Sequence, residues 1–151
     1  MTRAKTLAAA ALLTLAACAR KPPDATPEGA VREFVERMRA VRGDAQDAKA
    51  GYELLSKRAQ ANLTERAQRY SFASGKPIAA EMMITPSKFA LRFEPQRYVA
   101  VQVAGSFALV EVTGLAADQR ARVPCVFEGT GWRVDMALPP LPPVQKRPNL
   151  R

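Results

Sequence analysis

The chain contains no histidine, and only two of its 151 residues are cysteine. Histidine is the commonest general base and the commonest metal ligand, so its absence removes both, together with any cysteine–histidine nucleophile. No cluster of acidic residues has metal-ligand spacing, and Gly75-Lys76 lacks the glycine-rich run of a phosphate-binding loop. The sequence therefore predicts no metal and no cofactor, and it favours a non-enzymatic protein over an enzyme.

Long hydrophobic runs are also missing. The apolar run at residues 7–15 is nine residues long, whereas a helix needs roughly 20 apolar residues to cross a bilayer. Arg3 and Lys5 precede this run, and Leu15-Ala16-Ala17-Cys18 ends it. A cationic start, a short apolar segment and small residues before a cleavage point describe a secretory signal. The run is therefore predicted to target the chain rather than to span a membrane.

The last four residues of this segment resemble the lipobox of bacterial lipoproteins. The resemblance implies that residues 1–17 are a signal peptide, that the chain is cut before Cys18 and that the Cys18 thiol carries a lipid. Two or three acyl chains anchor a protein stably, because each buried methylene contributes about 0.8 kcal/mol. Ala19 is non-acidic, which resembles outer-membrane sorting, so we expect a protein anchored in the outer membrane and facing the periplasm. The alternative is an ordinary secretory signal with an incidental cysteine.

Cysteine use agrees with export. Once Cys18 is used by the anchor, Cys125 is the one cysteine left, so the mature chain has no intramolecular disulfide. Cys125 alternates with Val123 and Phe127, which predicts a buried strand residue rather than a reactive thiol.

Acidic residues are scarce relative to basic ones, with 14 of the former, 23 of the latter and a net charge of +9. The basic residues are scattered through the first half and recur in the tail at Lys146, Arg147 and Arg151. For an exported protein this charge favours a solvated surface, or contact with lipid phosphates or an anionic cell-wall polymer, over nucleic acid.

The first half of the chain has a helical period. Residues 18–26 are predicted to form the lipid anchor and a short tether, because they contain Pro22 and Pro23 and no apolar periodicity. Thr26 suits the cap of a helix that starts at Pro27 and ends at Gly43. The expected inner stripe of this helix is Val31, Phe34, Val35, Met38 and Val41.

Two further helices are expected before residue 75. Asp44 is predicted to cap the first of them and Ser56 to interrupt it. Asn62 and Glu65 have capping-box spacing, which predicts that a third helix restarts at Asn62 and is broken at Gly75. The inner face of the helix after Asp44 is expected to carry Ala48, Tyr52 and Leu55.

Beyond Gly75-Lys76-Pro77 the period changes from helical to two, which predicts strands. Pro124 cannot donate to a ladder, so its strand is expected to be an edge or to be bulged. Helices followed by hairpin-connected strands predict an α+β fold, with the helices on one face of an antiparallel sheet. The strands are expected within residues 89–93, 99–103, 108–112, 123–128 and 132–137.

Several motifs, in their order along the chain, resemble small lipoproteins with the nuclear transport factor 2-like fold, which includes SnoaL-like and ketosteroid isomerase-like proteins. The resemblance covers residues 26–138 and implies a cone-shaped domain at residues 27–138, in which a curved sheet wraps helices around a pocket. That fold hosts enzymes, carriers and assembly modules, so it implies little about activity. The motifs are Pro27-Glu28-Gly29-Ala30-Val31, Phe34-Val35, Arg42-Gly43-Asp44, Tyr52-Glu53-Leu54-Leu55-Ser56 and Gly131-Trp132-Arg133-Val134-Asp135.

The remaining segment, residues 139–151, is rich in proline and basic residues. It is expected to be a polyproline II strap or spacer rather than a ligand for an aromatic groove.

Three functional hypotheses follow. A binding module for an apolar small molecule would have a pocket rimmed by Arg69, Lys76 or Arg92. An interaction module would instead fill this pocket and expose the outer faces of strands 99–103 and 107–112 to an envelope protein, a cell-wall polymer or a second copy. The residues expected to line the pocket, or else to fill the core, are Tyr52, Tyr70, Phe72, Met82, Met83 and Phe89.

The third hypothesis is an isomerase-like pocket enzyme. It would use Asp135 or Glu111 as the base, with a tyrosine as hydrogen-bond donor. None of these residues aligns with the catalytic pattern of that family, and a structural role for both carboxylates is favoured. We therefore expect a lipid-anchored, non-enzymatic envelope protein.

Overall fold

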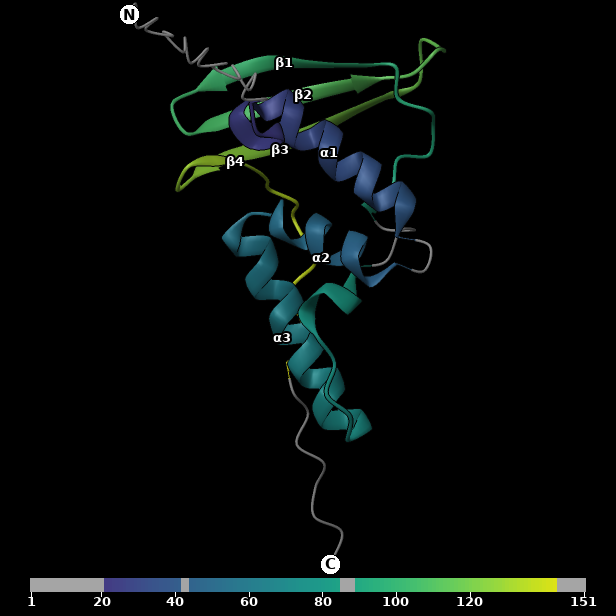
Figure 1. Ribbon diagram of the computed structural model, residues 1–151, viewed down its shortest axis with the longest axis vertical. Coiled ribbons are helices and arrows are strands. Elements are labelled where there is room, and N and C mark those ends of the chain that lie inside the picture. Colours follow the sequence, from purple (N-terminus) through teal and green to yellow (C-terminus); the bar gives the residue numbers. More distant parts are fainter. Residues whose placement is uncertain (1–20, 42–43, 85–88, 144–151) are drawn as a thin grey trace, which may run out of the picture.

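The computed structural model describes residues 21–41, 44–84 and 89–143 (Figure 1). The predicted anchor at Cys18, the predicted helix end at Gly43 and the basic end of the tail lie outside the described residues. Helices come first and strands follow, so the expected α+β class is confirmed. In chain order the elements are η1 (Pro23–Ala25), α1 (Pro27–Ala40), α2 (Ala45–Glu53), α3 (Lys57–Ser74), η2 (Ala80–Met83), β1 (Arg97–Ala104), β2 (Phe107–Thr113), β3 (Arg120–Glu128) and β4 (Gly131–Val134).

The sheet is an antiparallel meander in the order β1-β2-β3-β4, and α1 lies across one of its faces (Figure 1). The period of two in β2 points Ala108, Val110 and Val112 towards α1, where each is 0% exposed. From α1, the predicted stripe supplies the other half of this core. The buried residues of that stripe are Val31, Phe34, Val35 and Met38.

Helix boundaries follow the predicted caps at three places. The Thr26 hydroxyl accepts a hydrogen bond from the Gly29 amide at the start of α1, and the Asp44 carboxylate accepts one from the Gln46 amide at the start of α2. Gly75 ends α3 in the left-handed conformation, with φ of 69°.

The predicted restart at Asn62 is wrong, because α3 runs without interruption from Lys57 to Ser74. Ser56 already caps this helix, its hydroxyl accepting from the Ala59 amide at 3.2 Å. Asn62 and Glu65 face Arg66 and Arg69 within the same helix instead of closing a capping box.

The predicted strand near residues 89–93 is also wrong, since the sheet begins at Arg97. Phe89 is buried and helical, and Leu91 and Phe93 pack against the core from a bent, irregular segment that has no ladder partner. The alternation of apolar residues is real, but here it marks an irregular segment that lies over the core.

The expectation that Pro124 lies in an edge strand or at a bulge is also wrong. Its strand, β3, is internal, and the pairing of β2 with β3 has no register shift at this residue. The Pro124 carbonyl accepts from the Asp135 amide, one residue past the end of β4. The nitrogen of Pro124, which has no hydrogen to donate, therefore points towards Asp135, beyond the end of β4. The ladder between β3 and β4 loses no hydrogen bond there. The bulge lies in β1 instead, between Ala100 and Gln102.

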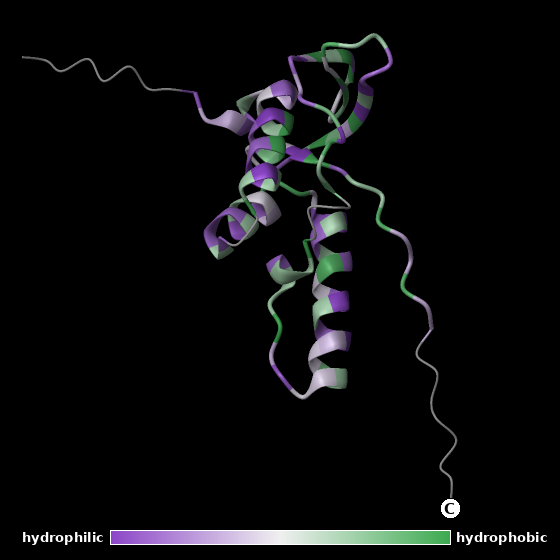
Figure 2. Ribbon diagram, turned by 90° about the vertical axis from the view of Figure 1, so that its right-hand side faces the viewer, coloured by the Kyte–Doolittle hydropathy of each residue, from purple (hydrophilic) through white to green (hydrophobic). Residues whose placement is uncertain are grey.

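α3 and η2 form an arm that projects away from the sheet (Figures 1 and 2). We call residues 57–84 the α3 arm. The start of the tail runs beside it, because Arg66 donates to the Pro139 carbonyl at 2.6 Å and Arg69 donates to the Pro142 carbonyl. These contacts agree with a strap. No helix within residues 21–41, 44–84 and 89–143 is both long and apolar enough to cross a membrane.

Candidate functional site

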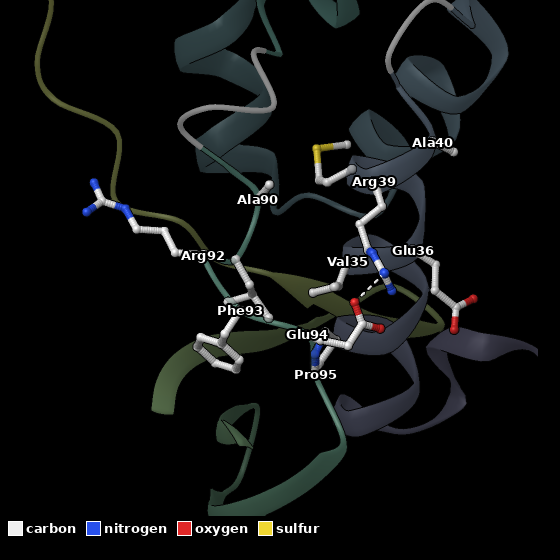
Figure 3. Close-up of a pocket in the computed structure, with 11 residues that line it drawn as sticks. Val35, Glu36, Arg39, Ala40, Ala90, Arg92, Phe93, Glu94 and Pro95 are labelled. Carbon is white, nitrogen blue, oxygen red and sulfur yellow. Dashed lines mark hydrogen bonds and ion pairs between the residues drawn. The ribbon is translucent and has the colours of Figure 1, made fainter. Parts of the chain in front are cut away.

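An open groove of about 1040 Å³ lies between the C-terminal half of α1 and the irregular segment at residues 90–95, which precedes β1 (Figure 3). Its floor is apolar, because it is lined by Val35 and Met38 of α1 and by Leu91 and Phe93 of the irregular segment. The side chains at its rim are charged: Glu36, Arg39, Arg92 and Glu94.

Arg39 and Glu94 pair across this groove, with 2.5 Å between the guanidinium nitrogen and the carboxylate oxygen (Figure 3). Both side chains are about half exposed, at 52% and 57%. An ion pair in water contributes only about 0–1 kcal/mol, so it can open for a ligand at little cost. The groove therefore suits an amphipathic ligand that lies along the surface.

The six residues expected at a pocket do not gather in one place. Tyr52 joins α2 to α3 through a 3.1 Å hydrogen bond between its hydroxyl and that of Thr64. Phe89 is buried edge-on against Phe34, and Met83 packs against the same core. The other three are exposed on the α3 arm: Tyr70 at 59%, Phe72 at 93% and Met82 at 64%. None of the six lines the groove.

The expected basic rim is also dispersed. Arg69 lies on α3, where it pairs with Glu65 at 2.6 Å, and Lys76 follows the end of that helix. Arg92 alone of the three lines the groove, and its side chain points outward in Figure 3.

Asp135 acts as a structural joint between the sheet and α3. Its carboxylate accepts from the Ser56 hydroxyl at 2.6 Å and from the Arg58 guanidinium at 2.8 and 3.2 Å. The Ser56 amide also donates to the Val134 carbonyl at 2.9 Å, so the start of α3 is fastened to the end of β4. The sequence places Asp135 beside Arg133, but the structure pairs Arg133 with Asp24.

Glu111 lies on the outer face of the sheet, opposite Arg122 on β3. Its carboxylate is 3.5 Å from Arg122 and 3.9 Å from Arg120. Neither Glu111 nor Asp135 lines the groove, so the two carboxylates weighed for an isomerase-like reaction hold the fold together at separate places.

Cys125 is 0% exposed in the centre of β3, as the sequence predicts. Burial in the apolar core raises the pKa of its thiol to about 12, so the thiol stays protonated at neutral pH. The nucleophilic form of cysteine is the thiolate, and Cys125 is therefore an inert core residue.

Comparison of the chain with models of protein families, with curated proteins and with solved structures finds no match. The interpretation of the groove and of the sheet therefore depends on their geometry and chemistry alone.

Proposed function

We propose that this protein is a lipid-anchored component of the bacterial cell envelope. The observation that carries the proposal is the Leu15-Ala16-Ala17-Cys18 motif at the end of a short apolar run. The described fold starts at Lys21, three residues after Cys18, so an anchor there would hold the domain close to the membrane. The non-acidic Ala19 supports the outer membrane as its location, with the domain in the periplasm.

The domain itself is proposed to be a non-enzymatic interaction module. Two observations support this function: the interior between α1 and the sheet is filled by fully buried side chains such as Val31 and Val110, and the groove is open with an apolar floor. Such a groove favours an extended amphipathic segment of an envelope partner over an enclosed small molecule. We further infer a nuclear transport factor 2-like arrangement, which the meander and its covering helix support.

Lipidation is tested by producing the full chain in a bacterium that processes lipoproteins. We expect the N-terminal peptide to begin at Cys18 and to carry acyl groups by mass spectrometry, and the protein to sediment with membranes. Cys18→Ser should leave the precursor without lipid and move most of the protein to the supernatant. The matched control is Cys125→Ala, which removes the other cysteine and should leave the lipid in place. An unmodified Cys18 in the wild-type protein would overturn the proposal.

The non-enzymatic role is tested by complementing a deletion strain. Glu111→Gln combined with Asp135→Asn removes both carboxylates weighed for catalysis and should still complement if it folds. Leu91→Ser combined with Arg39→Glu alters the floor and rim of the groove and should not complement, although its circular dichroism is expected to match the wild type. The reverse pattern would favour a pocket enzyme.

A further inference from the structure

One end of the sheet is exposed and largely apolar, and Glu128 is its one charged residue. We call residues 101–107 and 127–131 the hairpin end, because they form the β1–β2 and β3–β4 turns and their flanks. Although 25% of the chain is charged, the thirteen residues from 98 to 110 carry no charge at all. The exposed apolar side chains here are Val101 at 49%, Val103 at 58%, Phe107 at 37% and Phe127 at 43%.

An uncharged exposed hairpin of this kind is unusual. β1 is an edge strand, and proteins in water normally place charged residues on such edges to prevent association. The one charge in β1 is Arg97, at the far end of the strand from the turn. The composition of the hairpin end therefore indicates contact with something apolar.

The start of the described chain is fastened to this same end. Asp24 of η1 pairs with Arg133 of β4 at 2.5 Å. A side chain at Gly131 would collide with the Asp24 carboxylate, so glycine permits this close approach. The Phe127 amide donates to the Ser106 carbonyl at 2.7 Å, which joins the two turns to each other. In Figure 1 both turns and the purple start of α1 lie on the left of the sheet.

Glu128, which belongs to this end, and the carboxylates of Glu28 and Asp24 are each bonded within the protein. Glu28 accepts from the Ala100 amide at 3.1 Å, and Glu128 accepts from the Lys57 amide at 3.0 Å. Asp24 is paired with Arg133, as described above. Arg133 offsets the charge of Asp24 and lowers its repulsion from an anionic bilayer, whereas the neutral amides bonded to Glu28 and Glu128 leave those two charges in place.

Chain length then limits the distance to the membrane. Three residue steps separate Cys18 from Lys21, and an extended chain covers at most about 3.6 Å per residue, or about 11 Å here. If Cys18 carries the lipid, Lys21 lies within that distance of the attachment point, which allows the hairpin end, next to the Asp24–Arg133 pair, to reach the bilayer surface.

We propose that the hairpin end is a bilayer-docking surface, whose exposed Val103, Phe107 and Phe127 side chains enter the interfacial layer of the membrane that holds the anchor. This inference rests on the proposed lipidation of Cys18. Phe127 packs edge-on against the buried Trp132 at 5.6 Å between ring centroids and is itself 43% exposed, and phenylalanine side chains enter the boundary between headgroups and acyl chains in interfacial segments. The α3 arm extends on the side away from the edge strand β1 (Figure 1) and is left for water or a partner.

The test uses the full chain, lipidated in a bacterial host and placed one copy per nanodisc of phosphatidylethanolamine and phosphatidylglycerol. Ser106→Cys carries an environment-sensitive fluorophore at the β1–β2 turn, and Ser74→Cys carries it at the end of α3 as the matched control. The buried, protonated Cys125 is expected to stay unlabelled. Quenchers attached to lipid tails should remove most of the fluorescence at Ser106 and leave that at Ser74 unchanged.

Charge at the hairpin end should abolish this quenching. Val103→Glu combined with Phe127→Glu is expected to return the Ser106 probe to water, whereas Leu115→Glu, at an 86% exposed site in the β2–β3 turn, is expected to have no effect. If the double variant does not fold, Val103→Glu alone replaces it, with the same expected loss of quenching at Ser106.

The outcomes separate the two proposals. Absence of lipid on Cys18, read from the mass of the same sample, would overturn both. A lipidated protein whose Ser106 and Ser74 probes are equally unquenched would overturn docking and leave the anchor intact. Energy transfer between Ser106 probes in multi-copy vesicles, without quenching by lipid, would identify a second copy as the occupant and would also overturn docking.

Discussion

The hairpin end and the α3 arm both expose apolar side chains, but they differ in what surrounds them. Val103 lies within a stretch of thirteen uncharged residues, and Phe127 lies on β3 near the ion pair that holds the start of the described chain. Phe72 and Tyr70 lie on a helix that also carries charged residues on its surface, among them Arg66 and Arg69. Exposure alone therefore does not locate a binding surface. The uncharged run at residues 98–110 and the nearby start of the described chain distinguish the hairpin end from the arm.

Packing differs between the same two regions. The sheet and α1 bury large side chains such as Phe34, whereas the buried residues of α3 are Ala59, Leu63 and Ala67. The arm depends more on its attachments, which are the Asp135 joint at one end and the tail contacts along its length. We therefore expect the sheet to unfold only globally and the arm to open separately.

The largest effect is expected for Phe34→Ala, because Phe34 is 2% exposed and packs against Phe89 under the sheet. Such a truncation lowers the free energy of unfolding by about 3–5 kcal/mol. Leu63→Ala in the arm should lower the free energy of unfolding by about 2 kcal/mol, the low end for buried leucine truncations, since the neighbouring buried residues are small. Urea unfolding measures the free energy of unfolding of both variants. Equal losses would contradict the proposed difference in packing between the sheet and the arm.

A smaller effect is expected for Asp135→Asn at the joint. The change weakens hydrogen bonds to Ser56 and Arg58, and bonds to a charged group contribute about 1.5–3 kcal/mol. Arg58→Gln should cost less, about 0–1 kcal/mol, because its side chain is 66% exposed. Hydrogen exchange should show faster opening of α3 with unchanged protection in β2. Equal acceleration in both would show that the arm is not a separate unit.

The smallest effect is a dependence of stability on pH, which arises from Cys125 in the sheet. The pKa of Cys125 is about 12 in the folded protein, against about 8.5 in an unfolded chain. The folded state therefore keeps a proton that the unfolded state loses, so stability falls as pH rises above the lower value. The expected loss at pH 9.5 is about 1.4 kcal/mol.

Cys125→Ala provides the control for this loss, because burial also raises the pKa of Tyr98 and contributes in the same direction. The difference in slope between the two proteins, measured by urea unfolding from pH 7 to 9.5, isolates the thiol. Identical slopes would mean that Cys125 titrates normally and is not in a dry core.

Local patterns predicted the helices, except the start of α3, together with the caps at Thr26 and Asp44 and the buried face of β2, because these depend on neighbouring residues. Pro124 and the segment with Phe89 were mispredicted, since the lengths of β4 and of the ladder depend on distant parts of the chain. The groove was missed because Arg39 and Glu94 are 55 residues apart. A sequence signal for the hairpin end did exist, in the thirteen uncharged residues before Glu111.

The most direct test of the account is hydrogen exchange of the lipidated protein in nanodiscs compared with the same protein in detergent. The account predicts slower exchange in nanodiscs for peptides covering residues 99–107 and 126–131, with no change for residues 66–83. Protection of residues 66–83 instead, or of neither region, would contradict it.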